Sequence, residues 1–468
     1  MKKKILLWAT LCLVVLASVQ AATRPNVLFI AVDDLRADLG CYGNDVVYTP
    51  HLDKLADSGV TLTRAYCQVA VCGASRASLM TGTRPDTNGI YMLKPMVREA
   101  MPNVLTLTEC FKNNGYQTIG VGKIYHDFED DPQGWCDFEF TLSEQDQTYI
   151  QQRVEKNIWP PVLKADDVSD EYYSDGLIAQ RAIEHLQAQH NKKQEEPFFL
   201  AVGFKKPHLP FNAPKKYWDL YDRAEIKIPA RKHPQNTPKI AFTRWGEMRH
   251  YQGVPQEGDV SDELARQLIH GYQACVSYVD AQIGKVLTEL ERLGLRENTI
   301  VVVWGDHGWK VGEYGDWCKH TNFELDVRAP LIYSGPGIAK GRKGSGLVEF
   351  VDVYPTLVDL CGIKIPEHCE GSSSKKLLQN PSLPWKKAAF SQFTRDWAKA
   401  MGNSVRSGKW RYVEWVHDET GEILERELYD HAHTDIAIEN LANNPSYKKV
   451  VNEMSSILKE GWQNVIPE

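Results

Sequence analysis

The chain of 468 residues has no surplus of positive charge, no internal repeat and no low-complexity tract. Its 54 lysine and arginine residues are outnumbered by 61 aspartate and glutamate residues, which gives a formal net charge of −7. Proteins that bind nucleic acid carry a basic surface, so this balance predicts that nucleic acid is not a partner. An anionic substrate must therefore meet positive charge that is gathered locally in a pocket.

Long hydrophobic runs are also missing. A membrane-spanning helix takes about 20 apolar residues, whereas the apolar run at 5–16 soon gives way to small residues that end at Ala21 and Ala22. Basic residues 2–4 precede the run, and this order is typical of a secretory signal peptide. We expect residues 1–21 to be cleaved and the mature chain to be secreted or periplasmic, with no membrane association. An uncleaved membrane anchor is the alternative.

Two sequence motifs are absent, one built on cysteine and one on asparagine. No cysteines have the Cys-x-x-Cys spacing, which argues against a zinc ribbon. No Asn-x-Ser/Thr acceptor has a residue other than proline in the middle, which favours a bacterial exported protein over a glycosylated one. Ten cysteines are present; Cys361 and Cys369 are close enough in sequence to form a disulfide, and buried free thiols are the alternative.

Four apolar runs of strand length end in charged or imidazole side chains. They are Asn26–Val32 before Asp33, Gln117–Gly122 before Lys123, Pro197–Phe204 before Lys205, and Thr299–Trp304 shortly before Asp306. Helical patterns lie between them, at 106–113, 174–189 and 263–293. This alternation predicts an α/β fold with a large mixed, mostly parallel sheet flanked by helices. Because ligands bind at the carboxyl ends of such strands, the four ends predict one active site.

The composition changes near residue 370. A polar loop at 370–376 is followed by short amphipathic strands at 409–415 and 427–430, and a helical pattern covers 447–462. These features predict a smaller antiparallel sheet plus helix that packs on the main domain. The expected organisation is therefore a signal at 1–21, a catalytic domain at 22–370 and a C-terminal subdomain at 371–468.

The segment that begins at Cys72 carries a recognisable motif. Cys72-Gly73-Ala74-Ser75-Arg76, followed by Thr81-Gly82, resembles the sulfatase signature, Cys-x-(Pro/Ala)-x-Arg and then Thr-Gly. The stretches 206–211 (Lys-Pro-His-Leu-Pro-Phe) and 306–309 (Asp-His-Gly-Trp) resemble the iduronate-2-sulfatase branch of that family more specifically. The resemblance covers nearly the whole mature chain. It implies an alkaline-phosphatase-like fold and a sulfuric ester hydrolase.

The resemblance also implies a modified nucleophile and a metal. In sulfatases the motif cysteine becomes formylglycine, so Cys72 is expected to be converted by a formylglycine-generating enzyme or an anaerobic maturase. The hydrate of that aldehyde attacks sulfur. Asp33, Asp34 and Asp306 offer hard oxygen ligands for one divalent cation, with Ca²⁺ expected and Mg²⁺ as the alternative. Cys72 and His307 complete the expected metal set.

Cationic residues supply the other expected roles. Arg76, one helical turn after the motif cysteine, faces the same way and is expected to hold the formylglycine oxygens. Lys123 and Lys319 are expected to place positive charge beside sulfate and hydrate oxygens. His126 is expected to orient or deprotonate the hydrate, and His208 to protonate the leaving oxygen as a general acid.

The substrate expectation comes from the branch. It implies removal of the 2-O-sulfate of a uronic acid, iduronate or a related sugar, in glycosaminoglycan fragments. A sulfatase for another sulfated glycan is one alternative. A metal-dependent phosphatase or phosphodiesterase on the same scaffold is another, although it would use Ser or Thr as nucleophile and histidine-rich zinc sites. A non-catalytic glycan-binding protein is the third. A further cationic group should meet the sugar carboxylate, and the sequence does not single one out.

Overall fold

The computed structural model describes residues 24–126, 130–192 and 196–467. The expected signal peptide at 1–21 lies outside the described residues. Within them, no helix combines the length and the apolar character that crossing a bilayer requires.

An eight-stranded sheet forms the centre of the molecule, and its strand order is β13-β2-β12-β9-β1-β7-β4-β5. The four predicted runs are neighbouring parallel strands in it: β9 (Thr299–Gly305), β1 (Asn26–Val32), β7 (Phe198–Phe204) and β4 (Gln117–Gly122). β12 (Leu331–Ser334) runs antiparallel to both of its neighbours. The prediction of a mixed, mostly parallel sheet is therefore confirmed.

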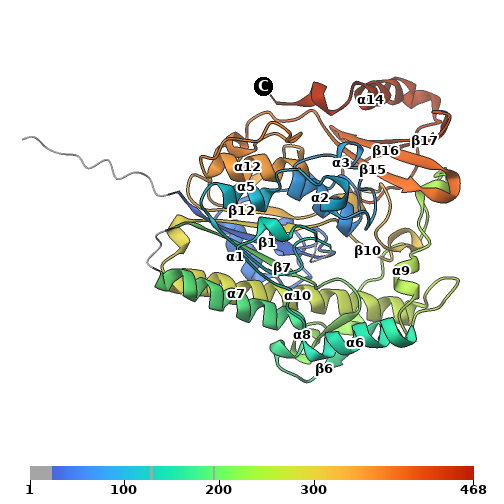
Figure 1. The fold of residues 1–468 in the computed structure, drawn as a ribbon. Coiled ribbons are helices and arrows are strands. Elements are labelled where there is room, and N and C mark those ends of the chain that lie inside the picture. The colour runs from blue at the N-terminus through green and yellow to red at the C-terminus, as the bar shows by residue number, and fades with distance from the viewer. Residues whose placement is uncertain (1–23, 127–129, 193–195, 468) are drawn as a thin grey trace, which may run out of the picture.

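Helices cover both faces of this sheet (Figure 1). Alternate residues of β1 show why. Leu28 and Ile30 pack into one apolar cluster with α1 (Pro50–Asp57), α7 (Ser174–Asn191) and α10 (Asp262–Arg292). Val27 and Phe29 pack into a second cluster with α2 (Cys72–Thr81), α5 (Leu107–Asn113) and α12 (Val353–Leu360). A strand that is buried on both faces must be apolar at every position, and β1 is apolar from Val27 to Val32.

Short elements complete the main domain. The short strands are β2 (Val60–Leu62), β3 (Ala65–Tyr66), β5 (Asp137–Glu139), β6 (Leu163–Asp166), β8 (Phe211–Pro214), β10 (Lys310–Val311), β11 (Trp317–Cys318), β13 (Arg342–Gly344) and β14 (Val348–Glu349). The further helices are α3 (Pro85–Asn88), α4 (Val97–Ala100), α6 (Glu144–Lys156), α8 (Lys215–Trp218), α9 (Gly246–Arg249), α11 (Glu324–Val327) and α13 (Lys375–Gln379).

The C-terminal part forms a separate antiparallel sheet of four strands in sequential order. They are β15 (Ala388–Arg395), β16 (Ala400–Ser407), β17 (Trp410–His417) and β18 (Ile423–Asp430). Helix α14 (Lys448–Glu460) covers one face, where Met454 packs with Val405 and Tyr412 (Figure 1). The predicted smaller sheet plus helix is confirmed.

Buried charges hold this sheet against the main domain. The Glu324 carboxylate accepts hydrogen bonds from Arg406 Nε at 3.1 Å and Arg411 Nη2 at 2.6 Å. Tyr66 donates its hydroxyl to the other oxygen at 2.8 Å. All four side chains are buried, so water screens none of these charges.

The cysteines of the described residues, 41 to 369, are all free thiols. Of the two possibilities for Cys361 and Cys369, the structure shows the unbridged form, with Cys361 buried and Cys369 partly buried.

Replacing Glu324 by alanine leaves two buried arginines without their carboxylate. We expect Glu324→Ala to lower the free energy of unfolding by about 3–5 kcal/mol, because an unpaired buried charge is costly. Glu291→Ala is the matched control, since its exposed ion pair with Lys54 is worth at most about 1 kcal/mol. Chemical denaturation measures both. Equal losses in the two variants would contradict the account of the buried cluster.

Candidate functional site

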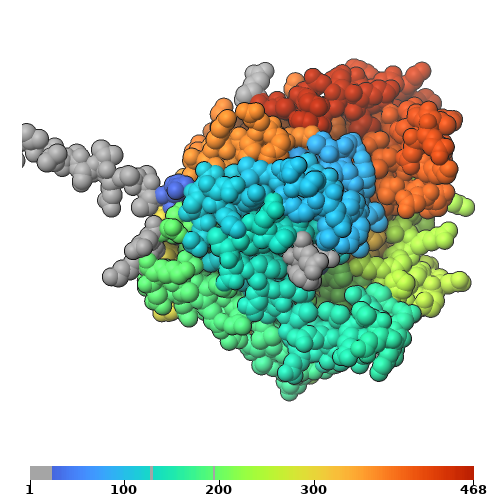
Figure 2. All heavy atoms as spheres, in the orientation of Figure 1, coloured from blue at the N-terminus to red at the C-terminus, as the bar shows by residue number. Residues whose placement is uncertain are grey.

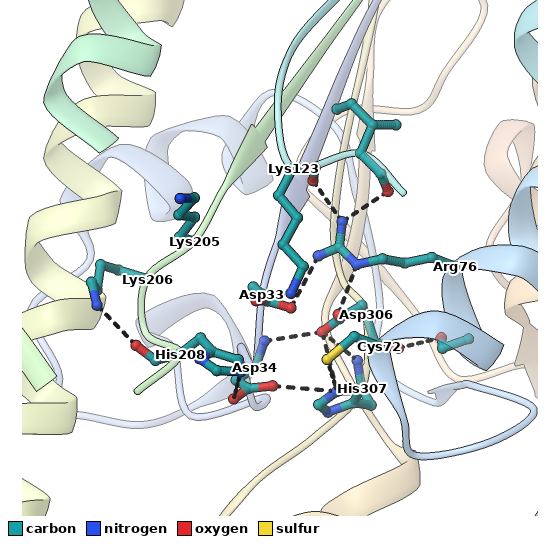
Figure 3. A network of polar contacts seen from close by, with 12 residues as sticks. Asp33, Asp34, Cys72, Arg76, Lys123, Lys205, Lys206, His208, Asp306 and His307 are labelled. Atoms are coloured by element: carbon teal, nitrogen blue, oxygen red, sulfur yellow. Dashed lines mark hydrogen bonds and ion pairs between the residues drawn. The ribbon is translucent and has the colours of Figure 1, made fainter. Parts of the chain in front are cut away.

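The carboxyl ends of the central strands bring the predicted polar residues to one place. Val32 of β1 is paired with Phe204 of β7 and with Gly305 of β9, so the residues that follow these strands emerge side by side. Figure 3 shows the resulting cluster, in which side chains from several separate segments point toward one centre. The predicted meeting of the strand ends therefore exists in the fold.

Three buried carboxylates form the core of the cluster. One oxygen from each of Asp33, Asp34 and Asp306 lies within 4.8 Å of the other two. Asp34 has a φ of 62°, a left-handed conformation that is uncommon outside glycine. Its backbone N–H donates to Asp306 Oδ1 at 3.0 Å. This interaction offsets the local strain and keeps the turn in place.

Arg76 on α2 holds these carboxylates together. Its Nε donates to Asp306 Oδ2 at 2.9 Å and its Nη2 to Asp33 Oδ1 at 3.3 Å. Its Nη1 donates to the carbonyl oxygens of Lys123 and Ile124 at 2.6 and 2.9 Å. The planar guanidinium, which is fully buried, thus joins segments that follow three different strands.

Cys72 is the first residue of α2, and its thiol points into the same cluster (Figure 3). His307 Nε2 lies 3.5 Å from Cys72 Sγ and 3.3 Å from Asp34 Oδ1. Burial raises the pKa of the thiol, but Lys123 and Lys319 outweigh it and leave the pKa below its usual value. An anionic or strongly polarised group is therefore favoured at this position.

Two lysines pair with the carboxylates. Lys123 Nζ forms an ion pair with Asp33, and Lys319 Nζ lies 2.9 and 3.1 Å from the two oxygens of Asp34. Burial raises the pKa of Asp33, but Lys123 and other cations outweigh it and hold that pKa well below its usual value. For Asp34, burial dominates and raises the pKa to about 7. The backbone of Lys123 packs directly against Gly203. A Cβ at position 203 would lie 2.0 Å from the Lys123 carbonyl oxygen, so a side chain there would displace this backbone.

His208 has a carboxylate partner that sequence reasoning missed. Its Nε2 lies 2.9 Å from Glu247 Oε1 and 3.9 Å from Asp34 Oδ2. Lys319 Nζ lies 3.0 Å from the other Glu247 oxygen. Glu247 is on the four-residue helix α9, in a segment without a strand end or a motif, so no sequence signal marked it.

His126 lies in the same cavity as Cys72 without touching the carboxylate core. Burial and the charge of Lys123 lower the pKa of His126 to about 4, so the imidazole is neutral at pH 7. In the described part of the chain, its Nδ1 has no hydrogen-bond partner. A neutral imidazole with an open nitrogen is suited to accept or relay a proton.

The cluster opens into a cavity of about 640 Å³. Figure 2 shows a hollow on this face between the segments that contain α2, α6 and α9, where they are coloured blue, teal and yellow-green. Its lining includes Cys72, Lys123, His208 and Lys319, together with Phe140, Tyr149, Ile150 and Tyr251. Its volume is within the range of small-molecule sites, which is about 300–1,000 Å³.

The chemistry of the donor set fits a hard divalent cation. The three carboxylates supply oxygen atoms, which Ca²⁺ and Mg²⁺ prefer. His307 Nδ1 lies 2.9 Å from the carbonyl oxygen of Gly308, which leaves Nε2 aimed at the cluster. The residues predicted as metal ligands are therefore brought together, with Cys72 beside them.

Comparison with known proteins agrees with this geometry. The model of the family described as Sulfatase matches residues 25–363, and that described as N-sulphoglucosamine sulphohydrolase, C-terminal, matches 312–464. The chain belongs to the sulfatase family. It is 33% identical to iduronate 2-sulfatase of Mus musculus, over 90% of this chain and 90% of that protein. It is 32% identical to a sulfatase of Formosa agariphila, over 93% of this chain and 86% of that protein.

The fold is shared more widely than the chemistry. The phosphonate monoester hydrolase of Silicibacter pomeroyi has a similar structure, with a TM-score of 0.76 at 23% identity, covering 94% of this chain and 96% of that one. Fold similarity therefore does not separate sulfate from phosphonate chemistry. The family match together with the iduronate 2-sulfatase relatives supports a sulfatase, an enzyme that hydrolyses sulfate esters, and the family implies a formylglycine and a divalent metal.

The acidic cluster predicts a metal-dependent stability. We expect the purified sulfatase to contain one divalent cation, and chelation to lower Tm by a few °C, because a ligand bound only by the folded state stabilises it by about 2.7 kcal/mol at 100 times Kd. Asp34→Asn should abolish this dependence on metal, whereas Asp45→Asn, at an exposed position, should retain it. Elemental analysis and thermal denaturation measure these effects. An unchanged Tm after chelation of wild-type protein would contradict the metal assignment.

Proposed function

We propose that this sulfatase removes the 2-O-sulfate of a uronic acid, iduronate or a related sugar, from glycosaminoglycan fragments, using a formylglycine at position 72. One observation carries the proposal: Cys72 Sγ lies within 4.8 Å of ligand atoms of Asp34 and His307 inside a buried acidic cluster. The iduronate 2-sulfatase relatives support the 2-O position. A maturase acts on Cys72, and the chain works outside the cytoplasm after removal of its signal.

The acidic residues would hold the metal. Asp33, Asp34 and Asp306, with His307 and the modified Cys72 beside them, would bind one Ca²⁺. When bound, it supplies positive charge to the sulfate oxygens and acidifies the attacking hydroxyl. Arg76 contacts two of the carboxylates, so it keeps the oxygen donors in register while the substrate enters and leaves.

The two lysines would bind the charged group of the substrate. Lys123 and Lys319 both line the cavity, and each is oriented by a carboxylate of the cluster. A sulfate ester repels nucleophiles because its oxygens carry negative charge. Preorganised ammonium groups offset that repulsion most strongly where little water reaches them. Lys319 is buried and the Lys123 side chain is only 12% exposed.

The two histidines would move protons. His208 Nδ1 lies 2.8 Å from the carbonyl oxygen of Leu209, which leaves Nε2 to carry the proton for the leaving oxygen. Glu247 sits beside that nitrogen and favours the protonated ring. His126, neutral and with an open nitrogen, would orient or deprotonate the hydroxyl at position 72. The proposed acid, His208, therefore follows β7, and the proposed base, His126, follows β4.

The modification at position 72 is open to direct measurement. In active protein from its native host, the peptide that contains residue 72 should be lighter than its cysteine form by about 18 Da, as conversion of a thiol to an aldehyde requires. Cys72→Ser, made in a host that modifies only cysteine, should abolish turnover and leave Tm unchanged. Unmodified cysteine in fully active protein would contradict the formylglycine.

The regiochemistry is tested with a panel of sulfated uronate disaccharides. We expect sulfate release from the 2-O-sulfated member at a kcat/KM at least about 100-fold above that for 6-O- or N-sulfated members, since each misplaced polar contact costs several kcal/mol. Ion chromatography measures the sulfate. Preferential release from a 6-O- or N-sulfate would refute the substrate while leaving the sulfatase activity intact.

A further inference from the structure

The cations of the active-site cavity are nearly all paired within the protein. Lys123 pairs with Asp33, and Lys319 pairs with Asp34 and Glu247. Lys206 is not paired with an acid, but its Nζ donates to two backbone carbonyl oxygens, those of His208 at 3.0 Å and Pro210 at 2.6 Å. These groups are therefore already satisfied before a substrate arrives.

Lys205 is different. It follows β7, lines the same cavity and is half-buried. Its Nζ lies 5.1 Å from the ring centre of Phe140, and no carboxylate of the described residues forms an ion pair with it. In Figure 3 it stands beside Lys206 but outside the dashed network that joins the catalytic groups. Burial lowers the pKa of this amine, which reflects a charge that is partly removed from water.

Two acidic side chains lie near Lys205, and each has another hydrogen-bond partner. A carboxylate oxygen of Asp146, which also lines the cavity, accepts a hydrogen bond from the Ser174 hydroxyl. The two carboxylate oxygens of Asp175 accept hydrogen bonds from the backbone N–H groups of Lys205 and Lys206, each at 2.8 Å. Asp175 therefore fixes the backbone of this segment and does not form an ion pair with the Lys205 ammonium. A partly dehydrated cation without a partner is unfavourable, and an anion from outside relieves that cost.

The other basic side chains of the cavity are less suited than Lys205 to bind an anion. Arg153 is exposed and lies over the ring of Trp159 at 5.2 Å, where water screens its charge. His126 and His320 have their pKa values lowered to about 4 and about 3, chiefly by burial, so both are neutral at pH 7. Within the described residues, Lys205 is thus the half-buried cavity cation whose charge is left for a ligand.

We propose that Lys205 recognises the carboxylate of the uronic acid, its Nζ donating to a carboxylate oxygen while the catalytic cluster holds the sulfate. This inference rests on the proposed function, because it needs a substrate with both anionic groups. Lys205 is a specificity-determining residue here and takes no part in bond breaking. The separation of unpaired Lys205 from the paired catalytic lysines lets one cavity distinguish two anions on one sugar.

The test compares the kinetics of wild type and one variant on two substrates, the free acid and its methyl ester. Lys205→Met keeps the length of the side chain and removes its charge. It should lower kcat/KM for the 2-O-sulfated uronate about 10- to 100-fold, the usual range for a hydrogen bond to a charged group. For the methyl ester of the same sugar, kcat/KM should be the same in wild type and variant. Lys205→Arg should restore most of the preference for the free acid, and Arg153→Met should leave that preference unchanged.

The outcomes separate the two proposals. Equal losses on acid and ester would overturn the assignment of Lys205, and so would no loss on either, while the 2-O-uronate function would stand. Wild-type protein that cleaves neither uronate, yet releases sulfate from another sugar, would overturn the proposed function and this inference with it. Thermal denaturation of each variant confirms that the fold is intact before the kinetics are compared.

Discussion

The contact between the Arg76 guanidinium and the Asp306 carboxylate is the interaction on which the site depends. Both side chains are fully buried, with Nε and Oδ2 2.9 Å apart. The same guanidinium reaches Asp33 and the backbone that follows β4. Burial makes each charge costly unless its partner is in place. One side chain on α2 therefore fixes the relative positions of three strand ends and places the neighbouring Cys72 against them.

The surrounding charges follow from that arrangement. Once three carboxylates are brought within a few ångströms, like-charge repulsion must be offset by cations. Lys123 and Lys319 supply part of that charge. Burial nevertheless raises the pKa of Asp34 to about 7, with a smaller contribution from Asp33, so the negative charge on this carboxylate stays costly. The site is thus built to gain stability from a further positive charge.

Much of this was predictable because the relevant signals are local. β1 and β4 have the predicted bounds, since a strand buried on both faces is apolar throughout. β18 was expected only at its end, 427–430, because its first half, Ile423–Arg426, is largely exposed and its composition resembles a loop. The convergence of the charged strand ends followed from the rule for parallel sheets.

The missed residues depend on the fold. Glu247 meets His208 only because α9, far from any strand end, folds over the cavity. Lys205 and Lys206 are adjacent in sequence, and nothing there distinguishes them. Their different roles arise because one amine turns to backbone carbonyl oxygens and the other remains beside an aromatic ring. Tertiary contacts determine these side-chain orientations, and the periodicity of the sequence does not encode them.

The contact between Glu324 and the arginines of β16 and β17 has a consequence for incomplete chains. Glu324 lies five residues after Lys319, on the segment that delivers this amine to the cavity. A chain that stops before β16 would retain every group of the acidic cluster and still lose the anchor of that segment. Premature termination before β16, which begins at residue 400 of 468, therefore disturbs the reaction centre, although no described residue beyond that point lines the cavity.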